Sequence, residues 1–199
     1  MITRKEMTRM LLKEGLLSYL ANNSFESVTV TSLCKASGIT RSTFYLHYSN
    51  IMEIVDDLVD DAIAYSKPGM VDNNNLQTIA NTLSAASNSV SLREAYDSIF
   101  DRLPLCQRII RHKKYLPLFL DEQISEYVLQ RIIGSEKDRQ GLVMAEALGI
   151  SFDVGVSVFV FLVHGLYAVN KQYKWSQSDE WLEAQKTIFE LVYRGLQSR

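Results

Sequence analysis

Apolar residues return every three or four positions through most of this chain, and few prolines or glycines interrupt them. Such spacing places apolar side chains on one face of a helix. A glycine inside a helix costs about 1 kcal/mol relative to alanine, so at Gly15 we expect another helix to approach closely. A first helix is predicted over residues 3–22, with an apolar stripe made of Met7, Met10, Leu11, Leu17 and Leu20.

The next residues predict two more helices joined by a tight turn. Thr29 is expected to cap a second helix that ends at Ser37. Gly38 can adopt the left-handed conformation that ends a helix, and Thr40 can accept a hydrogen bond from a free backbone amide of the next helix. Only Ile39 lies between these two residues, which leaves room for nothing longer than a tight turn.

The third predicted helix is short and has two unlike sides. Phe44 and Tyr48 are four residues apart and are expected to face inward. Arg41, Ser42 and Tyr45 lie on another side, with Arg41 and Ser42 nearest the N-terminus. A short helix that presents polar side chains from its first turn is what readout of the DNA major groove requires. The alternative is an ordinary corner between two helices inside a helical protein.

The rest of the chain predicts further helices. A fourth helix opens at Asn50 with an Asn-x-x-Glu capping pattern and carries an acidic face, which has to point away from DNA or towards cations. The acidic residues are Glu53, Asp56, Asp57, Asp60 and Asp61. A linker is expected over 67–75, followed by helices at 76–90, 91–103, 104–114 and 116–133, a loop at 134–138 and a helix at 139–148.

Two helices at 152–174 and 178–197 are expected to close the chain. The uncharged stretch 154–169 is shorter than the roughly twenty residues that a bilayer span needs, and it contains His164, so we expect a buried helix and no membrane. A helix that is apolar on all sides has to be covered on all sides. We therefore expect a four-helix bundle between two copies of the chain; a single thick monomeric core is the alternative.

The net charge of −2 is unevenly divided. Residues 1–50 hold six basic and three acidic side chains, a net +3, so the remainder carries −5. A basic head on an acidic body fits phosphate binding at one end of the molecule. Cys34 and Cys106 show no paired spacing and the histidines are scattered, so neither a metal site nor a disulfide is expected.

The run from Phe25 to Asn50 carries many residues in a fixed order, and it resembles the N-terminal domain of the TetR/AcrR family of transcriptional regulators. The matching features are Phe25, Thr29-Val30, the small core positions Cys34 and Ala36, Gly38-Ile39-Thr40, Thr43-Phe44-Tyr45 and His47-Tyr48. The sequence departs from the family at Ile51, where a phosphate-binding lysine is usual.

This resemblance implies an all-α fold with two domains: a three-helix helix-turn-helix DNA-binding domain at 1–50, and a helical effector-binding and dimerisation domain at 51–199. It implies a homodimer that binds a palindromic operator in double-stranded DNA and represses transcription until a small-molecule effector releases it. A helical protein-interaction module with a degenerate head is the alternative. No signal peptide opens the chain, so a cytoplasmic protein is expected.

Two sets of candidate site residues follow. The expected DNA contacts are Thr31, Arg41, Ser42 and Tyr45 near bases, and Lys35, Thr40, Thr43 and His47 at phosphates. The candidate effector pocket consists of Tyr96, Phe100, Phe119, Tyr127, Phe161 and His164, although aromatic residues at helical spacing are more often plain core. A basic run, Arg108, Arg111, His112, Lys113 and Lys114, is expected to be a solvated helix face; a site for an acidic effector or partner is the alternative. No glycine-rich phosphate loop or nucleophile motif supports an enzyme or a cofactor.

Overall fold

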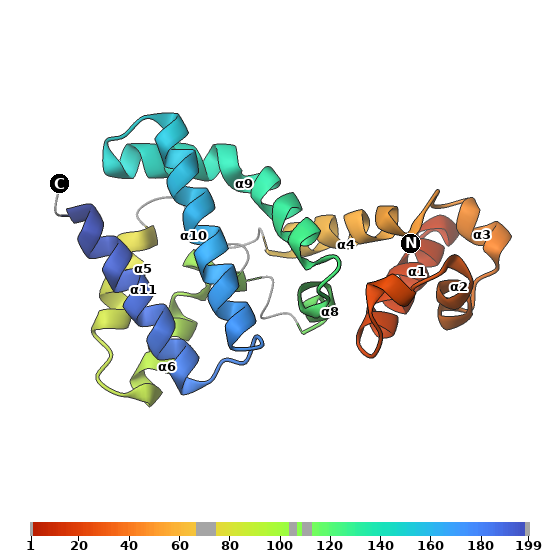
Figure 1. Cartoon of the computed structure of the whole chain (residues 1–199), viewed down its shortest axis with the longest axis horizontal. Coiled ribbons are helices and arrows are strands. Elements are labelled where there is room, and N and C mark those ends of the chain that lie inside the picture. Colours follow the sequence, from red (N-terminus) through yellow and green to blue (C-terminus); the bar gives the residue numbers. More distant parts are fainter. Residues whose placement is uncertain (1, 67–74, 104–106, 109–112, 198–199) are drawn as a thin grey trace. The chain divides into compact units, whose positions relative to one another are not determined.

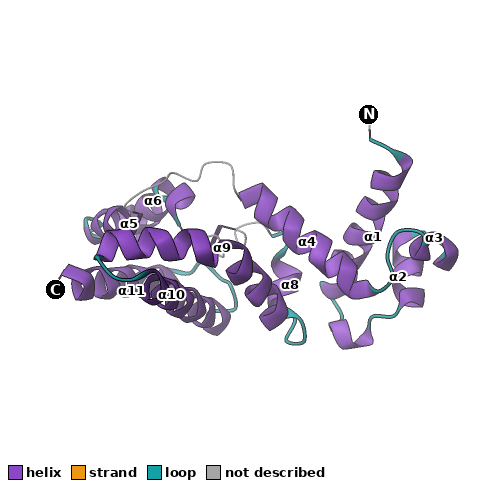
Figure 2. Ribbon diagram, turned by 90° about the horizontal axis from the view of Figure 1, so that it is seen from above, coloured by secondary structure: helices purple, strands orange, loops and turns teal. Residues whose placement is uncertain are grey.

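A computed structural model describes residues 2–66, 75–103, 107–108 and 113–197 (Figure 1). These residues form ten α-helices and two 3-10 helices, and no strand occurs among them (Figure 2). The chain divides into two compact units, one of residues 1–66 with 109–132 and one of 67–108 with 133–199. The boundary expected after residue 50 differs from this division, because the fourth helix and a later segment pack with the N-terminal helices.

The first unit contains the predicted N-terminal helices. They are α1 (Arg4–Leu20), the 3-10 turn η1 (Phe25–Ser27), α2 (Val30–Ser37), α3 (Arg41–Tyr45) and α4 (Ile51–Ser66). The later segment adds α8 (Leu116–Leu120) and the start of α9 (Ser125–Leu148). Thr3 and Thr29 cap α1 and α2 in complete capping boxes, while Asn50 accepts from the Glu53 amide at the start of α4.

The apolar stripe predicted for α1 is wrong in its N-terminal half. Met7, Met10 and Leu11 are exposed, and the buried face instead runs through Leu12 and Leu16. The first helix is apolar on two sides, so spacing alone did not indicate which side the core covers. The close approach expected at Gly15 is confirmed, because a Cβ added there would lie 2.0 Å from Ser37 Oγ of α2.

The second unit is built from α5 (Asn75–Ser84), α6 (Ser89–Ser98), the 3-10 turn η2 (Phe100–Arg102), the rest of α9, α10 (Phe152–Gln172) and α11 (Asp179–Gln197). Its apolar core draws on all four of α5, α6, α10 and α11; the largest side chains in it include Tyr96, Trp181 and Phe189. Two left-handed residues, Lys174 and Trp175, turn the chain between α10 and α11.

Several element boundaries differ from the prediction. The expected helix at 116–133 is two helices, separated where Asp121 accepts hydrogen bonds from the amides of Gln123 and Ile124. The expected loop at 134–138 lies inside α9, since Gly134 weakens a helix without ending it. Most of the expected helix at 104–114, Cys106, and the linker at 67–74 lie outside the described residues. Arg108, expected on a solvated face, is buried.

The helix α10 is covered on one side only within this chain. Gly155, Phe159, Val163 and Leu166 are buried, whereas Phe152, Val154 and Phe161 are exposed. The expectation of a helix buried all round is therefore not met by a single copy. Among the described residues α10 is also the one helix that is long and apolar enough to cross a membrane, so the length argument against a span does not hold.

A pair of glycines brings α9 and α10 close together. A Cβ added to Gly155 would lie 2.3 Å from the backbone oxygen of Gly141 and 2.9 Å from the Ala145 backbone nitrogen. Backbone atoms cannot move aside as a flexible side chain would. The two helices therefore cross at a distance that only glycine permits.

We predict that Gly155→Ala lowers the free energy of unfolding by about 2 kcal/mol or more, because the added methyl group overpacks this crossing. Urea unfolding followed by circular dichroism measures the change. The matched control is Gly134→Ala in α9, where nothing lies within 4 Å of an added Cβ. That variant is expected to be stabilised by up to about 1 kcal/mol; equal effects at the two positions would contradict the close crossing.

Candidate nucleic-acid interface

The turn between α2 and α3 is built as the sequence predicted. Gly38 has a φ of +67°. The amides of Gly38 and Ile39 donate to the carbonyl oxygens of Lys35 and Cys34, which satisfies the last turn of α2. The Thr40 hydroxyl then accepts from the Thr43 amide at 3.2 Å and starts α3. Local hydrogen bonds therefore end α2 and start α3 on either side of the turn.

The short helix α3 has a buried and an exposed side. Phe44 is buried against the rest of the unit, as predicted. Tyr48 is buried too, but it lies in the turn that follows α3, because the helix ends at Tyr45. Arg41, Ser42 and Tyr45 are exposed, and Tyr45 keeps 54% of its surface although its ring meets Phe44 edge-on. One aromatic side of the helix therefore holds it in place while the other side remains available to a partner.

The remaining candidate contacts differ in exposure and in their hydrogen-bond partners. Thr31 and Lys35 are exposed on α2. Thr40 and Thr43 bond to each other through their hydroxyls at 2.8 Å, in addition to the cap. His47 is half-buried, and its Nδ1 is buried with no hydrogen-bond partner in the described part of the chain. Ala36, expected in the core, is exposed.

A polar cluster that sequence reasoning missed holds the turn that follows α3. Tyr48 Oη donates to Asp57 Oδ2 at 2.6 Å, and Arg9 Nε lies 3.2 Å from Tyr48 Oη and 3.0 Å from the same carboxylate oxygen. Burial and the hydrogen bond to Asp57 raise the pKa of Tyr48 well above its ordinary value. The guanidinium of Arg9 also lies over the Tyr48 ring. These contacts tie the turn after α3 to α1 and α4.

The acidic face of α4 is turned towards cations, as one of the two predicted options required. Arg9 pairs with Asp57, and Lys13 pairs with Asp61. Arg131 of α9 lies 3.3 Å from Asp56 and 2.8 Å from Asp60. Most of the negative charge beside the basic head is therefore offset within the unit.

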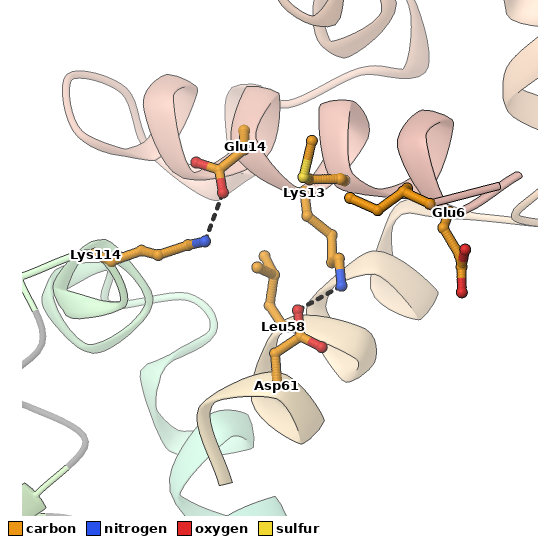
Figure 3. Close-up of a pocket in the computed structure, with 8 residues that line it drawn as sticks. Glu6, Lys13, Glu14, Leu58, Asp61 and Lys114 are labelled. Carbon is orange, nitrogen blue, oxygen red and sulfur yellow. Dashed lines mark hydrogen bonds and ion pairs between the residues drawn. The ribbon is translucent and has the colours of Figure 1, made fainter. Parts of the chain in front are cut away.

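A hollow of about 490 Å³ lies between α1, α4 and Lys114 (Figure 3). Two ion pairs line it, Lys13 with Asp61 and Lys114 with Glu14, the latter at 2.6 Å. Because each lysine already faces a carboxylate, this hollow offers no free positive charge to a phosphate.

Four basic residues of the head remain uncommitted. Arg4, Lys5, Lys35 and Arg41 are exposed, and none of them takes part in an ion pair among the described residues. Of the six basic residues counted in the sequence, Arg9 and Lys13 are therefore structural. The number of unpaired cations follows from the tertiary structure and was not readable from spacing.

The six candidate pocket residues do not share one unit. Phe119 and Tyr127 belong to the first unit, and Tyr127 is partly exposed and donates to Asp56 at 2.5 Å. Tyr96, Phe100, Phe161 and His164 belong to the second. Tyr96 is buried there, whereas Phe161 is 73% exposed, so these two side chains face different surroundings. No hollow described in the first unit is lined by any of the six.

Comparison with known proteins found no matching protein-family model, curated protein or solved structure.

We predict that Tyr48→Phe lowers the free energy of unfolding by about 1.5–3 kcal/mol, the range for a hydrogen bond to a charged group. Urea unfolding at neutral pH measures it. Tyr45→Phe changes an exposed tyrosine three residues earlier in the chain; it is the matched control and is expected to change stability by less than about 0.5 kcal/mol. Similar values for the two variants would show that the cluster does not hold α3.

The cluster also predicts a pH dependence. Burial raises the pKa of Asp57, but the hydrogen bonds from Arg9 and Tyr48 outweigh it, so the pKa lies below the ordinary value. Such a carboxylate stabilises the fold above its unfolded pKa of about 4, and this contribution is lost as the pH falls through the folded value. The stability difference between the wild type and Asp57→Asn is therefore expected to be complete at pH 6 and to shrink below about pH 4.

Proposed function

We propose that the chain is a DNA-binding transcriptional regulator of the TetR/AcrR type, in which α2, the turn at Gly38 and α3 are the helix-turn-helix motif. The observation that carries the proposal is the two-sided α3: Phe44 anchors one side, and Arg41, Ser42 and Tyr45 are exposed on the other. The buried Tyr48 holds the turn that follows. In such a motif, side chains near the N-terminus of the second helix contact base edges in the major groove.

The charge distribution supports the same proposal. DNA binding draws most of its affinity from phosphates, and cations already paired with carboxylates contribute little to it. The exposed residues Arg4, Lys5, Lys35 and Arg41 are available for that role, while the carboxylates of α4 face Arg9, Lys13 and Arg131. The protein's slight negative net charge is therefore no obstacle to a basic reading head.

Within the motif each residue has a proposed role. Arg41, Ser42 and Tyr45 read bases, with Thr31 beside them from the start of α2. Lys35, Thr40, Thr43 and His47 hold phosphates. Arginine can donate two bonds to guanine, and each good pair of this kind discriminates by about 1–3 kcal/mol. Ile51, at the position where the family has a phosphate-binding lysine, removes one backbone contact.

A homodimer completes the proposal, since a palindromic operator needs two reading heads. The exposed apolar residues of α10 and α11 support it: Phe161 is 73% and Leu191 is 72% exposed in the single chain. A second copy that pairs its own α10 and α11 with these helices would bury them in a four-helix bundle. The opposite side of α10 packs against α9 and α11. A soluble, cytoplasmic protein with no membrane partner is part of the proposal.

The regulatory part of the proposal is repression released by a small-molecule effector in the second unit. Effector binding and DNA binding would be coupled energetically, because the effector favours a spacing of the two heads that no longer fits successive major grooves. No enzyme activity and no cofactor are proposed.

A second candidate function is a helical protein-interaction module that has kept the head without its DNA activity. Ile51 favours this second candidate, because the position lacks the lysine that would contact a DNA phosphate. Enrichment of bound fragments from a random DNA pool separates the two candidates, since a regulator returns a half-site and its spacing. An interaction module enriches no sequence and forms no salt-sensitive specific complex.

We predict that Arg41→Ala weakens binding to the enriched site by about 1–3 kcal/mol and relaxes the preference for one base pair in each half-site. Lys35→Ala is the matched control, expected to weaken all sequences alike and to make the salt dependence shallower. Gel shifts at two salt concentrations measure both effects. An unchanged base preference in Arg41→Ala would refute the assignment of Arg41 to a base.

We also predict that Phe161→Glu converts the dimer into monomers, because it would bury two unpaired carboxylates in the apolar interface. Sedimentation velocity at micromolar concentration measures the association state. Val90→Glu, which replaces another exposed apolar residue in α6, is the control and is expected to remain dimeric. A Phe161→Glu dimer would place the interface elsewhere.

A further inference from the structure

The interior of the second unit is mostly apolar, yet amide side chains are buried in it. Asn170, near the end of α10, is 2% exposed, and Gln185, in the middle of α11, is 0% exposed. Both connect to one aromatic pair, in which Tyr96 meets Trp181 edge-on with the ring centroids 5.1 Å apart. Buried amides need hydrogen-bond partners for both their oxygen and their amino group.

The oxygen of Asn170 is accounted for by the fold. Trp181 Nε1 donates to Asn170 Oδ1 at 2.8 Å. An indole nitrogen can only donate, so the amide oxygen has to face it, and this determines the orientation of the Asn170 side chain. The amino group of Asn170 then points elsewhere, buried and without a partner among the described residues.

Gln185 ends a short chain of hydrogen bonds in the same way. Tyr96 Oη donates to Gln107 Oε1 at 3.1 Å, and Gln107 Nε2 donates to Gln185 Oε1 at 3.2 Å. The amino group of Gln185 is left buried with no partner in the described part of the chain. Two sets of hydrogen bonds, one starting at Tyr96 and one at Trp181, therefore each end at a side-chain amide whose amino group has no partner among the described residues.

Such groups are costly to keep. A buried donor without a partner destabilises a protein by about 1–3 kcal/mol, whereas an apolar side chain of similar shape is often neutral or better. Leucine or methionine at position 185 would continue the apolar core around Trp181, Leu182 and Phe189. Two buried donors without a partner call for an explanation, and acceptor atoms of a bound molecule would satisfy both of them.

We propose that the amino groups of Asn170 and Gln185 form the polar end of a binding site for a small uncharged molecule with a carbonyl oxygen and an apolar body. The ligand carries an acceptor because both groups are donors. The two amides by themselves favour an uncharged ligand, because neutral groups do not offset the desolvation of a buried carboxylate. That this site binds the regulatory effector rests on the proposed function. That it binds a ligand rests on the two buried amides alone.

The indole signal of Trp181 is a direct reporter of this site. The chain has two tryptophans, so the Trp175→Phe variant assigns the Trp181 Nε1–H resonance in a ¹⁵N-labelled full-length protein. Acetophenone and 2-octanone serve as carbonyl probes. Ethylbenzene, which lacks the oxygen, and benzoate, which is charged, are the matched comparisons.

We expect either ketone to shift the Trp181 resonance saturably, and neither ethylbenzene nor benzoate to do so. Gln185→Met should weaken ketone binding about fivefold, the equivalent of one neutral hydrogen bond of about 1 kcal/mol. Asn170→Asp keeps an oxygen that accepts from Trp181 Nε1 but replaces the donating amino group by a second oxygen. Ketone binding is therefore expected to weaken in this variant as well. The control is Gln172→Met, an exposed glutamine of α10, which should leave binding unchanged.

The inference fails if no ketone shifts the signal, if ethylbenzene or benzoate does so equally well, or if both Gln185→Met and Asn170→Asp bind ketone normally. A melting temperature close to that of the wild type establishes that a variant is folded. The enrichment from random DNA is scored separately. If the protein binds ketone but enriches no DNA sequence, the ligand site is supported and the proposed DNA-binding function is refuted. If it enriches a DNA sequence but binds no ketone, the DNA-binding function is supported and the ligand site is refuted.

Discussion

The contact of Arg9 with Tyr48 and Asp57 is the constraint on which the first unit depends. The three residues come from α1, from the turn after α3 and from α4, so one cluster joins all the elements that decide where α3 points. The helix itself is too short to be stable by propensity alone. Its position is therefore a tertiary property, secured by Phe44 in the core and by this partly buried charge cluster.

The same cluster changes the electrostatic picture of the head. Arg9 and Lys13 offset carboxylates of α4, and Arg131 offsets two more. What remains exposed is a small set of basic residues on the outer side, which includes Arg41 on α3 and Lys35 on α2. A charge count over residues 1–50 overstates the free cations, and a count over the remainder overstates the free acidity of α4 beside them. These two overestimates partly cancel, so the N-terminal residues remain more basic than the rest of the chain.

The second unit uses a different means to hold its helices. Gly141 and Gly155 allow α9 and α10 to approach until backbone atoms nearly touch, and aromatic residues fill the core between α6 and α11. Against this tight packing, the buried amides of Asn170 and Gln185 are the exception. Natural sequences break the rules of a well-packed core chiefly where function requires it, which is why these amides support a ligand site better than the aromatic residues alone do.

Local chemistry was enough to predict the all-helical class, the caps at Thr29 and Thr40, the left-handed Gly38 and the two-sided α3. Each of these depends on residues close together in the chain. Spacing also indicated that another helix meets α1 at Gly15, since a glycine in a helix interior has a cost that close packing explains.

The covered side of α1, the continuation of α9 through Gly134 and the pairing of Arg9 and Lys13 were not predictable in this way. They depend on residues many positions apart, such as Arg9 with Asp57 or Trp181 with Asn170, and no local pattern records those distances. Periodicity identifies apolar faces, but only tertiary packing decides which face is buried and which charges remain free, because burial and ion pairing are properties of the partners that folding brings together.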